Sequence, residues 1–342
     1  MQRRSNASVF MGRSTSYRLE SIVRVVKRSR TGRVWTLLAA SVTVAALLLL
    51  LAAPGCGRRL AQGRMKVAAS IVPLADFCRN VGGDRVEVRV MVPPGASPHT
   101  FEPTSGQMKF LSDARVLVVN GMSLESWATQ VIGKIDNPGL VEVEAGRAVP
   151  KARLIMAVER SQTGGHDDRA AFDPHFWLDP GLAVYEVNAI RDGFIKADPA
   201  GKDVYRRNAS DYVGMLEELD REIAAETSDF TRRKFVALHP AWTYFAERYG
   251  LEQVGVVEEL PGKEPGASHI AGLISDIRTH DVKVVVAEPQ LSSRAAEVIA
   301  REAGPGVVVV KLDPLGNPDN PEVDTYIKMM KHDVDVMRGA MR

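Results

Sequence analysis

Four side chains that can bind a metal ion stand beside prolines at the ends of strongly apolar segments. His99 follows "VRVMVPPGASP", while His239 ends "KFVALH" and Asp313 ends "VVVVKLD", each immediately before a proline. His175 lies in "FDPHFWLDPG", between two Asp-Pro pairs. Proline fixes its own φ and disfavours helical geometry in the preceding residue, so this last segment is expected to be neither regular helix nor central strand. All four side chains are predicted to sit on stiff backbone.

These residue types make a complete ligand set for one metal ion. Neutral imidazole nitrogens and a carboxylate are the usual donors for zinc and several other first-row metals. A lone histidine at a strand end is more often structural, but four such side chains, two from each half of the chain, favour a shared site. A filled tetrahedral shell carries metal, whereas a catalytic zinc keeps one position for water. The predicted ligands are His99, His175, His239 and Asp313.

Other ionisable side chains carry weaker signals. Glu288, in "VVVAEPQ", is predicted either to orient a ligand histidine or to form a salt bridge. His166, in "TGGHDDR", is expected in a solvated loop, the alternative being a weak accessory site with Asp167 and Asp168. The remaining histidines lie in or beside helical patterns and are expected to be surface or capping residues: His269, His280 and His332.

Eight short runs rich in β-branched residues alternate with longer helical patterns. The runs begin at Lys66, Val86, Arg115, Leu140, Lys234, Gln253, Val282 and Val307. Several are apolar on both alternating faces, which is typical of strands covered by helices on both sides. Alternating strands and helices indicate an α/β protein with doubly wound parallel sheets. In such sheets ligands bind beyond the carboxyl ends of the strands.

Residues 199–228 interrupt the alternation with one long helical pattern. Its apolar residues follow a spacing of four and three, which lines one face of a helix: Tyr205, Ala209, Tyr212, Leu216, Leu219 and Ile223. Such a helix is about 40 Å long at 1.5 Å per residue. We interpret it as a rigid connector between an N-terminal lobe, 65–198, and a C-terminal lobe, 229–342, with limited hinge motion. An ordinary long packing helix is the alternative.

The start of the chain reads as an export signal over residues 1–55, followed by a polar tether, 56–64. The first 33 residues carry nine Lys/Arg and one acid, and residues 34–55 are uncharged. The text "AAPGC" resembles a lipoprotein signal-peptidase site, which predicts a lipid on Cys56 and attachment to the membrane. A retained transmembrane anchor is the alternative. Both interpretations place the rest of the protein outside the cytoplasm. The chain has one other cysteine, Cys78, which is expected to be a buried thiol.

The charge balance of the remainder argues against a nucleic-acid partner. Without the first 33 residues the chain has 35 Lys/Arg against 41 Asp/Glu. This excess of acid is compatible with a cationic ligand. The chain also lacks the His-Glu-x-x-His pattern that supplies zinc ligands and a general base in many metallohydrolases.

Six ordered blocks resemble one family of proteins. They are "VPPGASPHTFEPT", "SDARVLVVNGMSLE", "DPHFWLDP", "ALHPAWTYFAERYGL", "VVVAEPQLS" and "KLDPLG". Together they resemble the metal-binding subunits of bacterial zinc and manganese ABC transporters, the cluster A-I or ZnuA-like solute-binding proteins. The resemblance implies two lobes joined by a long helix, with metal held in the cleft between them. It also implies the ligands His99, His175, His239 and Asp313.

The resemblance bears on the identity of the metal as well. Manganese-type members tend to place glutamate at the third ligand, so His239 is similar to the zinc-type arrangement. Zinc-type members often carry a histidine-rich insert before the second ligand, whereas residues 157–172 hold only His166. Zn²⁺ is the expected cargo, with Mn²⁺ and then Fe²⁺ as alternatives.

The expected function is that of an exported, monomeric carrier, periplasmic or at the cell surface. It would capture Zn²⁺ and pass the ion to an ABC permease in the cytoplasmic membrane. Because bound imidazoles must be neutral, uptake is expected to weaken as pH falls through about 6.5. An exported metallohydrolase and a surface adhesin are the alternatives from other classes.

Overall fold

The computed structural model describes residues 63–157, 172–260 and 262–342. Residues Gly63–Arg342 form one compact unit. The predicted export signal, Cys56, and His166 with its two neighbouring aspartates lie outside the described residues. Within the described ranges, none of the helices combines the length and the apolar character needed to cross a membrane.

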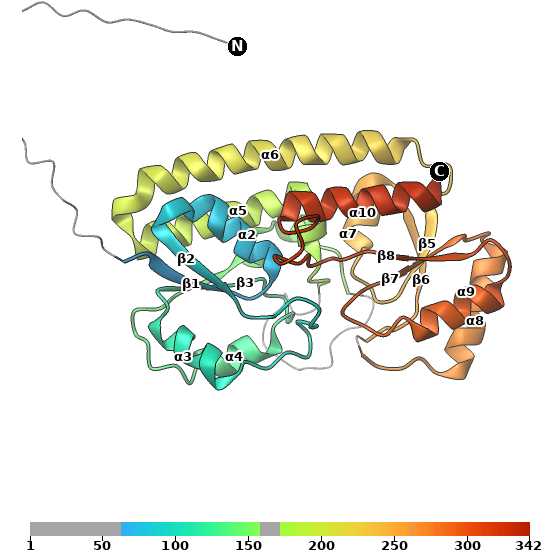
Figure 1. Cartoon of the computed structure of the whole chain (residues 1–342), viewed down its shortest axis with the longest axis horizontal. Coiled ribbons are helices and arrows are strands. Elements are labelled where there is room, and N and C mark those ends of the chain that lie inside the picture. The colour runs from blue at the N-terminus through green and yellow to red at the C-terminus, as the bar shows by residue number, and fades with distance from the viewer. Residues whose placement is uncertain (1–62, 158–171, 261) are drawn as a thin grey trace, which may run out of the picture. The chain divides into compact units, whose positions relative to one another are not determined.

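The first sheet has four parallel strands in the order β2-β1-β3-β4. Its strands are β1 (Met65–Ala69), β2 (Val86–Val90), β3 (Val116–Val119) and β4 (Val141–Glu144). Helices α2 (Val72–Gly82) and α5 (Pro180–Ala197) cover one face of this sheet, and α3 (Ser105–Asp113) and α4 (Ser126–Ile132) cover the other (Figure 1). Because both faces are covered, the central strand β3 is buried throughout, as its apolar sequence predicts.

The second sheet repeats this strand order as β6-β5-β7-β8, again with parallel pairs only. Its strands are β5 (Lys234–Ala237), β6 (Glu252–Val256), β7 (Val284–Ala287) and β8 (Val308–Lys311). One face packs with α7 (Thr243–Tyr249) and α10 (Tyr326–Met341), the other with α8 (Ala267–Thr279) and α9 (Arg294–Ala303). All eight strands coincide with the apolar runs of the sequence, which confirms the doubly wound α/β prediction.

The long helix predicted over 199–228 begins as a 3₁₀ turn, Pro199–Gly201, and continues as α6 (Lys202–Ser228). It runs past both sheets in Figure 1. The six residues predicted to share its apolar face are all buried, and they pack on α2, α5 and α10. The fold therefore has two lobes and one long helix, while the lobe boundaries themselves stay a prediction.

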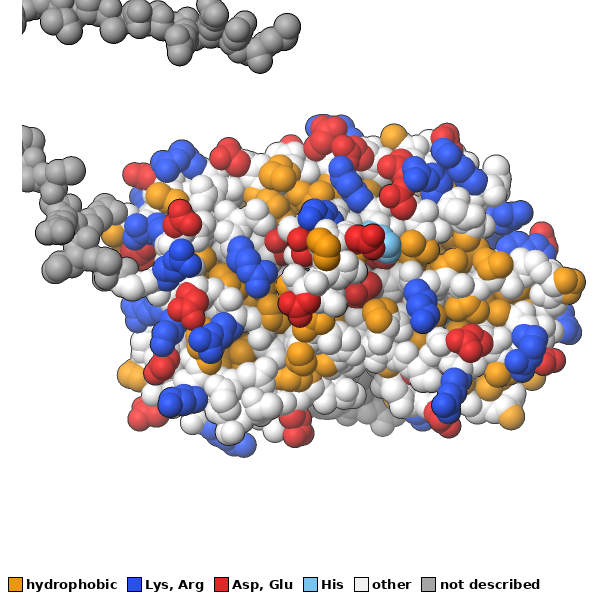
Figure 2. Space-filling model, in the orientation of Figure 1, with side chains coloured by type: hydrophobic (Ala, Val, Ile, Leu, Met, Phe, Trp, Pro, Cys, Tyr) orange, Lys and Arg blue, Asp and Glu red, His pale blue; other side chains and the backbone are white. Residues whose placement is uncertain are grey.

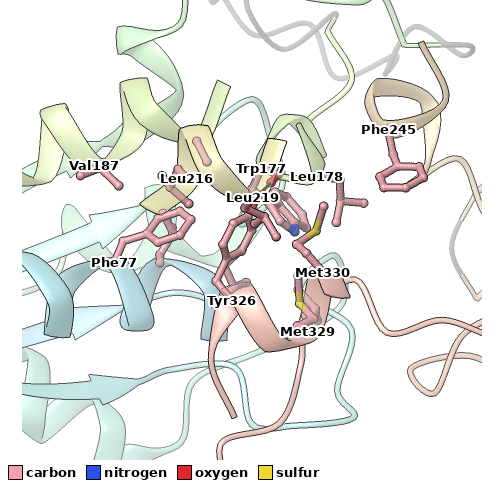
Figure 3. Packing of buried hydrophobic residues seen from close by; sticks show 14 of the residues in the cluster. Phe77, Trp177, Leu178, Val187, Leu216, Leu219, Phe245, Tyr326, Met329 and Met330 are labelled. Carbon is pink, nitrogen blue, oxygen red and sulfur yellow. Dashed lines mark hydrogen bonds between the residues drawn. The ribbon is translucent and has the colours of Figure 1, made fainter. Parts of the chain in front are cut away.

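The C-terminal helix α10 also crosses between the lobes, which the sequence pattern did not indicate. Figure 3 shows Tyr326 of α10 close to Phe77 of α2 and Leu219 of α6. These residues belong to a single buried apolar cluster that includes strands of both sheets. The lobes thus share one continuous core, so α6 is not their only connection.

The segment "FDPHFWLDPG" departs from the sequence prediction at its end. Phe176–Leu178 form a 3₁₀ turn, and the regular helix α5 begins at Pro180. The side chain of Asp179 accepts a hydrogen bond from the backbone N–H of Gly181 and caps this helix. A proline at the first helical position loses no backbone hydrogen bond, so an Asp-Pro pair can start a helix as well as prevent one.

Candidate metal centre

His175 is held in place by Asp173, two residues before it in the chain. The carboxylate oxygen Oδ1 of Asp173 accepts a hydrogen bond from the backbone N–H of His175 at 2.9 Å and lies 2.8 Å from its ring Nδ1. The hydroxyl of Tyr244 donates to the carbonyl oxygen of Asp173 at 3.0 Å, and Asn120 donates its side-chain amide to the carbonyl oxygen of Pro174 at 2.9 Å. The loop is therefore fixed, and the ring presents Nε2 as its free nitrogen.

His239 follows strand β5 and is oriented by a second carboxylate. Its Nδ1 lies 2.6 Å from Oε2 of Glu288, a buried residue directly after β7. The indole N–H of Trp242 donates to the other oxygen of Glu288 at 3.2 Å. Glu288 thus contacts a histidine of the predicted ligand set, as one of the two sequence interpretations expected. Carboxylates in this position fix the ring tautomer and increase the basicity of the other nitrogen.

The three predicted ligand histidines meet at their Nε2 atoms. Nε2 of His175 lies 3.3 Å from Nε2 of His99 and 3.3 Å from Nε2 of His239. The donor atoms of all three residues lie within 4.8 Å of one another. Two nitrogens bound tetrahedrally to one zinc ion at about 2.0–2.1 Å are about 3.3–3.4 Å apart. The spacing of the imidazoles therefore fits one zinc ion between them.

One pocket contains all three rings. Its other lining residues follow strands of both sheets or lie in the loop of His175: Ser97, Pro98, Trp177, Glu288, Gln290, Leu291, Pro314 and Leu315. The loops that carry His99 and His239 come after β2 and β5, at the carboxyl ends of parallel strands, while His175 lies just before α5. The general rule for ligand sites in such sheets thus locates this pocket correctly.

Asp313, the fourth predicted ligand, is not part of the histidine cluster. It follows β8, and its Oδ1 accepts hydrogen bonds from Nε2 of Gln290 at 2.7 Å and from the backbone N–H of Leu315 at 3.1 Å. Its own backbone N–H donates to Oδ1 of the buried Asp333 at 3.0 Å. The structure therefore gathers three of the four predicted side chains, and Asp313 contacts Gln290, which lines the pocket.

Burial and Glu288 shift the pKa values of two histidines of the cluster, His99 and His239. Burial, followed by the charges of the two other histidines, lowers the pKa of His99 well below its ordinary value, so this imidazole is neutral and ready for a metal ion. Burial also acts to lower the pKa of His239, but the nearby Glu288 carboxylate outweighs it and the pKa is raised. A metal ion therefore competes with a proton at His239 up to a pH above the ordinary imidazole pKa.

Of the residues that the structure describes, the other three histidines and Cys78 are not part of this cluster. His269 Nε2 lies 2.8 Å from the carbonyl oxygen of Val256, and His280 is the exposed C-cap of α8. His332 is half-buried on α10. Cys78 is fully buried, and burial raises the pKa of its thiol, as expected for an inert core residue.

Two residues of the site were missed from the sequence, Asp173 and Gln290. Asp173 gave a readable signal, because an aspartate two residues before a histidine can accept from that residue's backbone in an Asx turn. Gln290 gave none beyond its place two residues after Glu288.

Two α/β lobes, a long helix and three imidazoles spaced for one ion define a metal-binding protein of the periplasmic solute-binding class. The family model described as ZnuA, zinc-uptake complex component A, periplasmic, matches residues 67–340. The chain therefore belongs to this family of zinc ABC transporter substrate-binding proteins, whose members are metal-binding transport proteins and not enzymes.

Individual relatives agree with this assignment. The high-affinity zinc uptake system protein ZnuA of Bacillus subtilis is 29% identical over 310 residues, covering 87% of this chain and 96% of that protein. The zinc-binding protein AdcA of Streptococcus pyogenes serotype M6 is 29% identical over 290 residues, covering 82% of this chain but only 56% of AdcA, so the chain spans about half of that relative. A crystal structure of a ZnuA deletion mutant with zinc bound has a TM-score of 0.70 and 28% identity, covering 82% and 98% of the two chains.

Proposed function

We propose that this chain is the extracytoplasmic substrate-binding component of a zinc ABC transporter. It captures Zn²⁺ in the cleft between its lobes and delivers the ion to a permease in the cytoplasmic membrane. The observation that carries the proposal is the convergence of three Nε2 atoms at the separation of tetrahedral zinc ligands. The names of its relatives, a zinc uptake protein and a zinc-binding protein, support the same cargo.

The proposed ligands are His99, His175, His239 and Asp313. The histidines supply three neutral nitrogens, and Asp313 completes the shell by exchanging its hydrogen bond with Gln290 for a bond to the ion. A shell filled by protein donors suits a carrier, since no position is left for a reacting water molecule.

Zinc is preferred over the alternatives because imidazole donors dominate the site. Imidazole suits zinc, whereas carboxylate, carbonyl and water oxygens suit manganese. Mn²⁺, and after it Fe²⁺, are the alternative cargoes. A competition experiment, in which each ion is added to the zinc-loaded protein, shows which ion binds most tightly.

The family and the pattern of the first 64 residues support a location outside the cytoplasm. A family of periplasmic zinc-uptake components supports an exported protein. We propose that residues 1–55 direct export, that a lipid on Cys56 and the tether 56–64 hold the protein at the membrane, and that it acts as a monomer. The lobes proposed are 65–198 and 229–342, with 199–228 between them.

Other classes of function have less support. A metallohydrolase does not fit a family of transport proteins. On the face drawn in Figure 2, Lys and Arg side chains are interspersed with Asp and Glu, whereas a nucleic-acid interface gathers basic residues. A surface adhesin would bind a host protein even after loss of the histidine cluster, which gives a direct way to distinguish it.

Equilibrium dialysis of the purified protein against Zn²⁺ tests the proposal. We expect one tightly bound ion per chain. His239→Ala should weaken binding more than about a hundred-fold, since changes to groups that merely orient a ligand already cost about ten- to a hundred-fold. The matched control is His280→Ala, because His280 is an exposed helix cap. A chain that binds no zinc, or binds it equally well without His239, contradicts the proposal.

A further inference from the structure

Asp313 and Gln290 hold each other beside the metal pocket. Gln290 donates its side-chain N–H to Oδ1 of Asp313 at 2.7 Å, and the backbone N–H of Leu315 donates to the same oxygen at 3.1 Å. The carboxylate cannot accept from a carbonyl oxygen, so this contact fixes the orientation of the amide of Gln290, with its NH₂ group toward Asp313.

Gln290 depends on this one contact. Its carbonyl oxygen Oε1 is buried and accepts no hydrogen bond from any residue that the structure describes. Gln290 lines the pocket that contains the three imidazoles. Both hydrogen bonds to Asp313 end on Oδ1, but the carboxylate is not part of the histidine cluster. If the carboxylate moved to the cluster to bind an ion through either oxygen, the side chain of Gln290 would lose the only hydrogen bond that the described residues give it. Leaving such a group unpaired is unfavourable, so the contact opposes ligation by Asp313.

The cost falls unequally on different ions. Zinc gains most of its binding from the three imidazoles, which are already gathered without Asp313. Manganese prefers oxygen donors and a larger coordination number, so it depends more on the carboxylate. A hydrogen bond that keeps Asp313 on Gln290 therefore lowers the affinity for Mn²⁺ more than the affinity for Zn²⁺.

We propose that Gln290 is a selectivity-determining residue of the site, acting by competing with the bound ion for the Asp313 carboxylate. The inference rests on the proposed function, since it assigns a role at the same metal site. Gln290 is a positioning residue, which changes the choice between ions without itself binding one.

The test measures the affinity for Zn²⁺ and for Mn²⁺, by equilibrium dialysis and competition, in a double-mutant cycle. In Gln290→Leu, Mn²⁺ should bind on the order of ten-fold more tightly, the range of a hydrogen bond to a charged group, while the affinity for Zn²⁺ changes less. The ratio of zinc to manganese affinity therefore falls. In Asp313→Asn, the further change Gln290→Leu should leave this ratio unaltered, because no carboxylate remains to be released.

Gln253→Leu is the matched control. Gln253 is a half-buried glutamine on β6 whose Oε1 is likewise buried without a partner in the described part of the chain, and its loss should leave the ratio at the wild-type value. An unchanged ratio in Gln290→Leu, or an equal change in the Asp313→Asn background, would overturn the inference. The wild-type protein in the same dialysis separates the two proposals, because a chain that binds zinc but shows no effect of Gln290 contradicts only this inference.

Discussion

The hydroxyl of Tyr326 donates a 2.6 Å hydrogen bond to the backbone carbonyl oxygen of Trp177. Tyr326 begins α10 beside the second sheet, and Trp177 lies two residues after His175 in the loop of the first lobe. The indole N–H of Trp177 donates in turn to the carbonyl oxygen of Pro314, and the backbone N–H of Tyr326 donates to Asp76 of α2. Buried hydrogen bonds thus join the two lobes beside the pocket, whose lining includes Trp177 and Pro314.

Removing the hydroxyl of Tyr326 should destabilise the whole unit. Tyr326→Phe leaves the buried carbonyl of Trp177 without its donor, and we expect the free energy of unfolding to fall by about 1–3 kcal/mol. Urea unfolding of the metal-free protein measures this. Tyr185→Phe is the control, since Tyr185 is half-buried and its hydroxyl makes no hydrogen bond within the described residues. An effect no larger than that of the control would show that the link between lobes contributes little.

Glu288 should control both the strength and the pH dependence of zinc binding. In Glu288→Gln the orienting carboxylate is lost, and zinc affinity should fall about ten- to a hundred-fold at neutral pH. Because the carboxylate raises the pKa of His239, wild-type affinity should increase with pH up to a value above the ordinary imidazole pKa, about 6.5. In the variant, only the weaker effects of the Asp173 and Glu258 charges oppose burial, so this rise should move to lower pH.

Titration calorimetry in buffers of different ionisation enthalpy measures the protons released by zinc for both proteins. Near neutral pH, the wild type should release more protons than Glu288→Gln. Equal release from the two proteins would mean that Glu288 does not set the protonation of His239.

His99 should make the metal-free protein sensitive to acid. Burial lowers its pKa in the folded state, so the unfolded chain binds its proton more readily. Above the pKa of His99 in the unfolded chain, about 6.5, this histidine does not reduce the free energy of unfolding. As pH falls from there toward the lower pKa of the folded state, the unfolded chain takes up the proton first and the free energy of unfolding decreases. His239 has the opposite sign, because its raised pKa favours folding at low pH.

The variant His99→Gln isolates this contribution. Between pH 7.5 and 5.5 it should lose less stability in urea unfolding than the wild type. A variant that loses as much as the wild type would assign the acid sensitivity to other groups.

Zinc should stabilise the folded protein by mass action. A ligand that binds only the folded state at a thousand times its Kd adds about 4 kcal/mol to the free energy of unfolding. Thermal unfolding with zinc and then with excess chelator should show a reversible fall in Tm. In His175→Ala the difference in Tm between zinc and chelator should be much smaller. A difference as large as that of the wild type would mean that the stabilising ion binds elsewhere.

The sequence predicted the general position of the site because the physical causes are local. The prolines beside His99, His175 and His239, and the ends of apolar strands, are visible in the chain itself. The parallel α/β topology then brings strand ends together. The same reasoning located the eight strands and the buried face of α6.

The remaining features depend on contacts between distant side chains. Asp313 contacts Gln290 rather than joining the histidine cluster, through a hydrogen bond between residues 23 positions apart. No periodic pattern in the sequence indicates such a contact. The packing of α10 against α2 was missed for a similar reason, because an amphipathic pattern shows that a helix has a buried face but not what covers it. The helix that starts at Pro180 was missed because an Asp-Pro pair is compatible with both a turn and a helix N-terminus.

The wide separation of the three imidazoles along the chain has a consequence for biogenesis. His99 and His175 are 76 positions apart, and His175 and His239 are 64 apart. On the proposed function, a polypeptide that ends before His239 offers at most two of the three nitrogens. A truncated product would therefore lack the complete site, and only molecules that contain both lobes would take up the ion once they are outside the cytoplasm.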